Sequence, residues 1–201
     1  MTTANDAAPI YTIGHSNHEE QKFLDLLAAH AIDVLVDVRS QPYCGYSTHF
    51  NQEPLKRAVE ARGLKYLFLG RELGGRPEGD EFYDEEDHVL YGRVAASEFF
   101  KHGVERIERG RGQYRIALMC SEENPLVCHR WLLVTRVLRE RGIDVRHIRG
   151  DGRLQTDEDL EADDGDPDGP KQKLLFGGEE PPWRSLRSVS RNRPRPGSSD
   201  A

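Results

Sequence analysis

The sequence predicts an α/β protein, a three-layer sandwich in which helices cover both faces of a mainly parallel five-stranded sheet. Between residues 10 and 148, short apolar runs of strand length alternate with longer stretches whose apolar residues recur at helical spacing. Five strands alternating with four helices require right-handed crossovers, which leave the strands parallel and the helices on both faces. The fold is therefore Rossmann-like, although Gly14–His18 lacks the Gly-x-Gly-x-x-Gly of a dinucleotide fingerprint.

The five strands are short runs of β-branched and apolar residues. Asp33 to Val38, with the sequence Asp-Val-Leu-Val-Asp-Val, is apolar enough to be buried on both faces, as expected for a parallel strand. The other four strands are expected at residues 11–14, 65–69, 114–119 and 145–148.

The four helices are predicted from apolar periodicity and from their ends. Ser16 and Glu19 stand three residues apart, which predicts a capping box before a first helix that contains Phe23. Gly63 is expected to end the second helix and Gly142 the fourth, because glycine readily adopts the conformation that follows a helix. The third helix is indicated by Ala96, Phe100, Val104 and Ile107, and the body of the fourth by residues 132–138.

The composition favours one domain, expected at residues 10–152. A chain of 201 residues with 36% hydrophobic content can bury one sizeable core. Its formal charge of -7 argues against a general nucleic-acid coat, which needs a clustered basic excess. No apolar run approaches the roughly 18 residues that span a bilayer, so no membrane partner is expected. Three cysteines are typical of reduced thiols, and this predicts a cytoplasmic protein.

Residues 153–201 form a tail of different character, which is expected to be largely disordered. Residues 151–170 carry nine acidic residues against one arginine, whereas residues 183–196 hold five arginines and no acid. Few apolar residues are available to fold such a segment. Leu174–Phe176 is expected to be its short apolar anchor, and its arginines suggest a weak electrostatic contact to nucleic acid.

Polar residues gather where four of the predicted strands end. In open parallel sheets, ligands bind in the crevice outside the carboxyl ends of the strands. Gly14–His18 follows the first strand, Asp37–Ser40 ends the second, Arg71–Gly75 follows the third and Cys120–Glu123 ends the fourth. The sequence therefore predicts one cleft at this edge, and the residues expected in it are Cys120, Glu122, Cys128, His129 and Arg130.

The strongest local pattern joins the fourth strand to the helix that follows it. The strand ends at Cys120, and Asn-Pro then opens a helix whose first turn is expected to present Cys128, His129 and Arg130. A helix amino terminus favours anions and lowers the pKa of a thiol, so Cys128 is the better candidate for a thiolate. We expect Cys128 or Cys120 to act as nucleophile, with His129 or Glu122 transferring protons. The competing interpretation is that Cys128 is a small buried apolar side chain.

Other residues at the same edge are expected to bind the substrate. Arg39 can hold a carboxylate or phosphate with two donors, and Arg130 is expected to orient the substrate with it. Asp37 lies on the same side of the strand as Arg39, where an ion pair between them is as plausible as a catalytic role. His15 and Ser16 follow the first strand and complete the predicted binding set.

Five short motifs indicate a family. They are Gly14-His15-Ser16, Asp37-Val38-Arg39 followed by Pro42, Leu73-Gly74-Gly75, Cys120-x-Glu122 and Cys128-His129-Arg130. Together they closely resemble the domain of unknown function 488 family, over roughly residues 10–152. This resemblance implies an α/β fold and no established activity, so it supports the site and leaves the reaction open.

Known cysteine-loop enzymes differ from this pattern. A phosphatase or rhodanese loop wraps an anion with backbone amides and often places an arginine shortly after the cysteine. Here Glu122 and Glu123 would repel phosphate, and Arg130 stands ten residues after Cys120. The pattern therefore argues against a phosphatase.

A metal site is the main competitor to thiol chemistry. Neighbouring Cys128 and His129 would diverge by about 100° on a helix, however, and Arg130 would oppose a cation. We therefore expect no metal, and the sequence indicates no cofactor. The donors that suit zinc or iron are Cys120, Cys128, His129, His15 and Glu122.

The residues together favour an enzyme, a thiol-dependent hydrolase or transferase that acts on a small anionic or nucleotide-like substrate. The alternative is a non-catalytic ligand-sensing or nucleic-acid-associated module that uses the same pocket. A thiol that alkylates much faster than free cysteine would favour the enzyme. The sequence does not predict an oligomeric state.

Overall fold

The computed structural model of the chain describes residues 8–163 and 183–190. The predicted anchor Leu174–Phe176 and most of the predicted disordered tail lie outside the described residues. None of the helices in the described ranges is long and apolar enough to cross a membrane.

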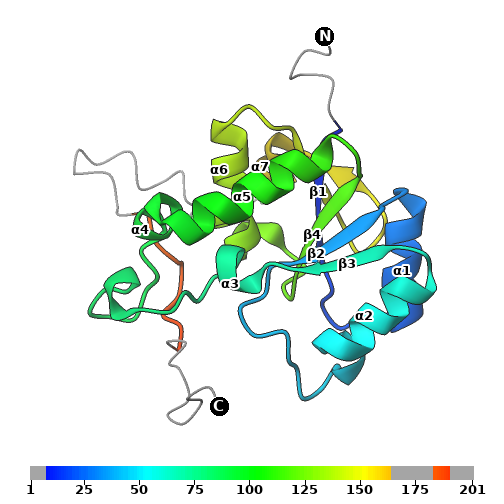
Figure 1. Ribbon diagram of the computed structural model, residues 1–201, viewed down its shortest axis with the longest axis horizontal. Coiled ribbons are helices and arrows are strands. Elements are labelled where there is room, and N and C mark those ends of the chain that lie inside the picture. The colour runs from blue at the N-terminus through cyan, green and yellow to red at the C-terminus, as the bar shows by residue number, and fades with distance from the viewer. Residues whose placement is uncertain (1–7, 164–182, 191–201) are drawn as a thin grey trace.

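A six-stranded sheet forms the middle layer of the fold (Figure 1). Its order is β3-β2-β4-β1-β5-β6; the first five are parallel and β6 is an antiparallel edge strand. The predicted α/β sandwich is confirmed, with one strand more than expected, because a two-residue strand shows no alternation in the sequence. The strands are β1 (Ile10–Gly14), β2 (Val34–Asp37), β3 (Lys65–Phe68), β4 (Ile116–Cys120), β5 (Val145–Ile148) and β6 (Leu154–Gln155).

The helices are more numerous and shorter than the sequence predicts. The predicted third helix is two helices, since Ala96 ends one and Ser97 caps the next by accepting a hydrogen bond from the Phe100 amide. The α-helices are α1 (Glu20–Ala29), α2 (Gln52–Ala61), α3 (Gly70–Leu73), α4 (Tyr91–Ala96), α5 (Glu98–Arg111), α6 (Arg136–Glu140) and α7 (Asp157–Asp163). Shorter helical segments are the 3-10 turns η1 (Thr48–Phe50), η2 (Asp80–Phe82) and η3 (Pro125–Val127), and the π-helix η4 (Arg130–Thr135), which runs into α6.

Two hydrophobic cores, one on each face of the sheet, produce the three layers. Helices α1 and α2 pack with Leu35 and Ala117 on one face, whereas α5 and α6 pack with Val36 and Leu118 on the other (Figure 1). Successive residues of a strand point to opposite faces of the sheet, so one strand can contribute side chains to both cores. Every residue of β1, β2 and β4 is buried, which explains why these three strands are largely apolar.

The ends of the helices agree with the sequence prediction at their carboxyl termini and differ at the first amino terminus. Gly63 and Gly142 follow α2 and α6 with φ of 78° and 73°, as glycine after a helix should. The predicted capping box of Ser16 and Glu19 is wrong. Glu19 precedes α1 without a side-chain cap, and Ser16 is in a turn with φ of 48°, where its amide donates to the Ser121 carbonyl.

Two described segments beyond Gly152 pack on the sheet and the helices. Residues 154–163, which the sequence assigns to the tail, form β6 and α7. Residues 183–190 run beside α4, where Trp183 donates from its indole nitrogen to the Leu132 carbonyl at 2.7 Å (Figure 1). The second segment reaches the carboxyl edge of the sheet and becomes part of the cleft described next.

Candidate functional site

A cleft of about 470 Å³ opens at the carboxyl ends of β2 and β4, two neighbouring strands of the sheet. This is the edge at which the sequence predicts a ligand site. From the predicted set, Cys120, Glu122, Cys128, His129 and Arg39 line the cleft.

The segment between Cys120 and α6 differs from the predicted helix start. Asn124 accepts a hydrogen bond from the Leu126 amide and caps a separate 3-10 turn, Pro125–Val127. Cys128 then has φ of -110° and ψ of 142°, an extended conformation, and the π-helix begins at Arg130. Cys128 therefore precedes the helix, and the expectation that its side chain diverges from that of His129 does not apply.

The thiols of Cys120 and Cys128 meet the imidazole of His129 at the floor of the cleft. The Nδ1 atom of His129 lies 3.6 Å from Cys120 Sγ and 3.9 Å from Cys128 Sγ. Its Nε2 atom donates to the Val38 carbonyl at 3.0 Å, so in the neutral ring the free Nδ1 lone pair faces the two sulfurs. Both cysteines are almost fully buried, with 4% and 2% of their surface exposed, whereas His129 is partly exposed.

The charges and hydrogen bonds at the floor of the cleft shift the pKa values of the two thiols in opposite directions. Burial opposes ionisation of Cys128, but a hydrogen bond with Cys120 and the positive charges of Arg130 and His129 hold its pKa well below the usual value. The hydrogen bond with Cys128 and burial together hold the pKa of Cys120 well above its usual value. Burial lowers the pKa of His129, but its hydrogen bond and attraction to Cys128 prevail and raise it. These opposite directions make Cys128 the more readily ionised of the two thiols.

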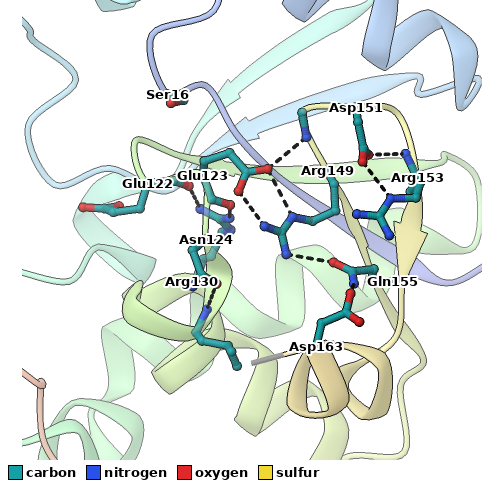
Figure 2. A network of polar contacts seen from close by, with 12 residues as sticks. Ser16, Glu122, Glu123, Asn124, Arg130, Arg149, Asp151, Arg153, Gln155 and Asp163 are labelled. Carbon is teal, nitrogen blue, oxygen red and sulfur yellow. Dashed lines mark hydrogen bonds and ion pairs between the residues drawn. The ribbon is translucent and has the colours of Figure 1, made fainter. Parts of the chain in front are cut away.

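Arg130, which the sequence places in the substrate-binding set, is not among the residues that line the cleft. Its side chain is only 1% exposed and donates to the carbonyl oxygens of Glu122 and Glu123, the latter at 2.7 Å (Figure 2). The Glu123 carboxylate in turn accepts from the Arg149 guanidinium at 2.7 Å and from the Gly150 amide at 2.9 Å. Two guanidinium groups thus hold the loop after β4 in place, and Arg130 positions this loop.

Asp37 and Arg39 form a buried ion pair, the interpretation that competes with a catalytic role for Asp37. The Arg39 guanidinium donates to both Asp37 carboxylate oxygens, at 2.9 and 2.6 Å, and to the Phe50 carbonyl. Tyr66 donates its hydroxyl to the same carboxylate at 2.7 Å. Asp37 is fully buried and does not line the cleft, so only Arg39 of this pair reaches it.

His15 and Ser16 lie behind the cleft or outside it. His15 Nε2 is 3.2 Å from the Arg39 Nη1 atom, and its Nδ1 is 2.8 Å from the Ser16 carbonyl. Burial and the Arg39 charge lower the pKa of His15 to about 4, so at neutral pH its uncharged ring accepts from Arg39. The Ser16 hydroxyl donates to the Asn17 side chain and does not line the cleft.

Two glycines of the sequence motifs have a steric role at this site. A Cβ on Gly75 would lie 2.7 Å from His129 Cγ, and one on Gly14 would lie 1.9 Å from the Glu122 carbonyl oxygen. Both positions therefore need glycine for close packing of the chain around the thiols. The motif Leu73-Gly74-Gly75 brings its loop against the His129 ring.

The sequence prediction misses two arginines that line the cleft, Arg76 and Arg187. Arg76 follows the glycine motif directly, a signal that was available in the sequence. Arg187 belongs to residues 185–189, which form one wall. That wall is held by Ser185, which exchanges hydrogen bonds with the backbone of Val89. Because this segment is far along the sequence from the other residues of the cleft, the sequence alone does not show that Arg187 lines it.

Comparison with known proteins gives one match. The family model described as "Domain of unknown function DUF488" matches residues 20–137, more than half of the chain. The matched range includes β2, β3, β4 and the segment with Cys128, His129 and Arg130. Neither the curated proteins nor the solved structures gave a match.

Proposed function

The chain belongs to the DUF488 family, whose description assigns no activity, and from the geometry of the cleft we propose that it is an enzyme. The proposed enzyme binds a small anionic or nucleotide-like substrate and performs a hydrolytic or group-transfer reaction on it. The reacting groups are Cys120, Cys128 and His129.

One observation carries this proposal: the Cys120 thiol at the end of β4 meets the Cys128 thiol and the His129 imidazole of a later segment at the floor of a cleft. Cysteines that only fill a core need no imidazole beside them. Such a cluster can act on an electrophile in two ways. A thiolate attacks while His129 transfers the proton, or the three groups hold an ion that activates water.

The walls of the cleft suit an anion. Arg76 and Arg187 both line it, and neither forms an ion pair with any residue in the ranges 8–163 and 183–190. The Glu122 carboxylate is the opposing charge, and it lies beside Cys120 on the floor side. Tyr43, which is 76% exposed, adds an aromatic surface against which a nucleotide base can stack. The volume of about 470 Å³ suits a small-molecule ligand.

The binding part of the proposal is tested by thermal shift with a panel of phosphorylated and carboxylated metabolites. A ligand at about 100 times its Kd stabilises the folded state by roughly 2.7 kcal/mol, which gives a clear rise in Tm. The double variant Arg76→Ala/Arg187→Ala should bind the same compound at least about tenfold more weakly, because each guanidinium supplies a charge-assisted hydrogen bond. Unchanged affinity in this variant would place the anion elsewhere.

A binding module without turnover is the second candidate, favoured by the low exposure of both thiols. Mass spectrometry of the bound compound separates the two functions. An enzyme converts the compound, and Cys128→Ser abolishes the conversion while the compound still binds. A binding module returns the compound unchanged from wild type and variant alike.

A further inference from the structure

The spacing of the three donor atoms at the cleft floor matches a metal site. The distances from His129 Nδ1 to the two sulfurs are 3.6 and 3.9 Å, and all three atoms lie within 4.8 Å of one another. In a tetrahedral zinc site, Zn–S bonds of about 2.3 Å and Zn–N bonds of about 2.0–2.1 Å put sulfur and nitrogen about 3.6 Å apart. The donors thus already stand close to three corners of such a tetrahedron.

The orientation of His129 is a second and independent observation. Metal-binding histidines almost always donate their other ring N–H to a carbonyl or a carboxylate, which fixes the tautomer and the ring. The Val38 carbonyl accepts this hydrogen bond from His129 Nε2 at 3.0 Å. The Arg130 amide also points at Cys128 Sγ, at 3.5 Å, as a donor to a negatively charged sulfur would.

We propose that Cys120, Cys128 and His129 bind a single zinc ion, with a fourth position open to the cleft. Two thiolates and one imidazole prefer zinc to magnesium, calcium or manganese. Two thiolates also neutralise the charge of the ion. Arg130 opposes it less than the sequence suggests, since its guanidinium is turned toward the Glu122 and Glu123 carbonyls.

This inference rests on the proposed function and gives it a reaction. Three protein ligands and an open position are typical of catalytic zinc, which lowers the pKa of bound water to about 7. The Cys120 thiol donates a hydrogen bond to Glu122 Oε2 at 3.2 Å, so this carboxylate would border the ion and would accept the proton of that water. The ion would thus supply an activated water: its oxygen would add to a carbon of the substrate, the bond to the departing group would break, and Glu122 would pass the proton to that group. The reaction is hydrolysis.

Cobalt titration of the reduced, chelator-stripped full-length chain tests the site. Wild type should bind one Co²⁺ per chain with thiolate-to-cobalt charge-transfer absorption in the near ultraviolet and the intense visible bands of a tetrahedral site, and zinc should displace it. The matched control Cys44→Ser should give the same spectrum, because Cys44 lies outside the cluster. Cys128→Ser should lose about half of the charge-transfer absorption and bind at least about tenfold more weakly.

Different results would contradict the metal site and the proposed function. A wild-type spectrum without thiolate charge transfer contradicts the metal site without any variant. An unchanged spectrum in a folded Cys120→Ser/Cys128→Ser variant also contradicts it. If substrate is still converted at full rate after chelation, the metal has no part in turnover, and the proposed enzyme is retained. If the chain binds cobalt through both thiols but binds no anion, the metal site is supported and the proposed function is contradicted.

Discussion

Two histidines of this molecule, His129 and His147, each have polar partners on both ring nitrogens, but only His129 lines a cleft. His147 on β5 has Nδ1 2.7 Å from the Thr12 hydroxyl and Nε2 2.7 Å from an Asp157 carboxylate oxygen, and it is 1% exposed. His129 has one nitrogen fixed by a backbone carbonyl, and the other faces two thiols beside a cleft. Around His147, the Thr12 hydroxyl, the imidazole and the Asp157 carboxylate follow the order of a catalytic triad. They form a closed network that attaches α7 to the sheet.

This difference separates a structural network from a site that can react. In the His147 network, Asp157 also accepts from the Trp131 indole at 2.7 Å and pairs with Arg139 at 2.7 Å. Its polar groups therefore satisfy one another, as buried polar groups must. At the cleft floor, the groups make long contacts with one another and border open space. Residue types alone favour either histidine as catalytic, and access decides between them.

The largest expected effect comes from replacing each of the two histidines in turn. Replacing His129 by Gln should lower turnover by about 10²–10⁴-fold, the usual loss for a general acid or base or a metal ligand. His147→Gln should lower stability and leave turnover per folded molecule within about twofold, since His147 touches only structural partners. Rates and urea unfolding on the same preparations check both. Equal loss of turnover in a folded His147→Gln variant would contradict the assignment.

Removing the carboxylate of the closed network should cost the most stability. Asp157→Ala leaves His147, Trp131 and Arg139 without their acceptor, and we expect a loss of about 2–4 kcal/mol in the free energy of unfolding. Glu158→Ala on the same helix is the control and should change it by no more than about 0.5 kcal/mol, because Glu158 is largely exposed. Equal effects in chemical denaturation would show that α7 is not held by this network.

Adding one methyl group beside His129 should affect the cleft more than the fold. In Gly75→Ala the new Cβ would meet the His129 ring at 2.7 Å, so the ring must move from the sulfurs. We expect turnover to fall by at least about tenfold with about 1–3 kcal/mol lost in stability. The control Gly45→Ala, where a Cβ would meet nothing within 4 Å, should behave as wild type. A Gly75→Ala chain with unchanged turnover would show that the position of His129 is not critical.

The smallest expected effect concerns pH. Burial, as the largest cause, lowers the pKa of His147 below its usual 6.5 in the folded state. The unfolded chain therefore takes up a proton below about pH 6.5 that folded His147 refuses, so this group's contribution to stability is lost as pH falls. Each such group changes stability by at most about 1.4 kcal/mol per pH unit. Urea unfolding between about pH 7 and pH 5 should show a shallower decline in His147→Gln than in wild type. Parallel declines would contradict the low pKa.

The fold was predictable because its signals are local. Buried strands such as Val34–Asp37 and the glycines after α2 and α6 follow from residue type and spacing. Strand β6 carries no such signal, since it has only two residues. The wall formed by residues 185–189 depends on a contact with Val89, nearly a hundred residues away in the chain.

The candidate site was predictable in its location and only partly in its roles. The meeting of Cys120, Cys128 and His129 follows from the end of β4 and the segment after it, but the case against a metal assumed a regular helix at Cys128. Asn124 instead caps a separate turn, which leaves Cys128 extended. Arg130 was expected in the cleft, but the buried carbonyls of the loop after β4 need donors, and its guanidinium satisfies them.

NMR of [15N]histidine-labelled protein during titration with phosphate, pyrophosphate and citrate tests most directly the claim that the cleft at His129 is the functional site. The side-chain resonances of His129 should shift and saturate with at least one of these anions, while those of His147 should stay in place. Equal shifts of the two histidines, or an anion that saturates the protein without moving His129, would contradict the account.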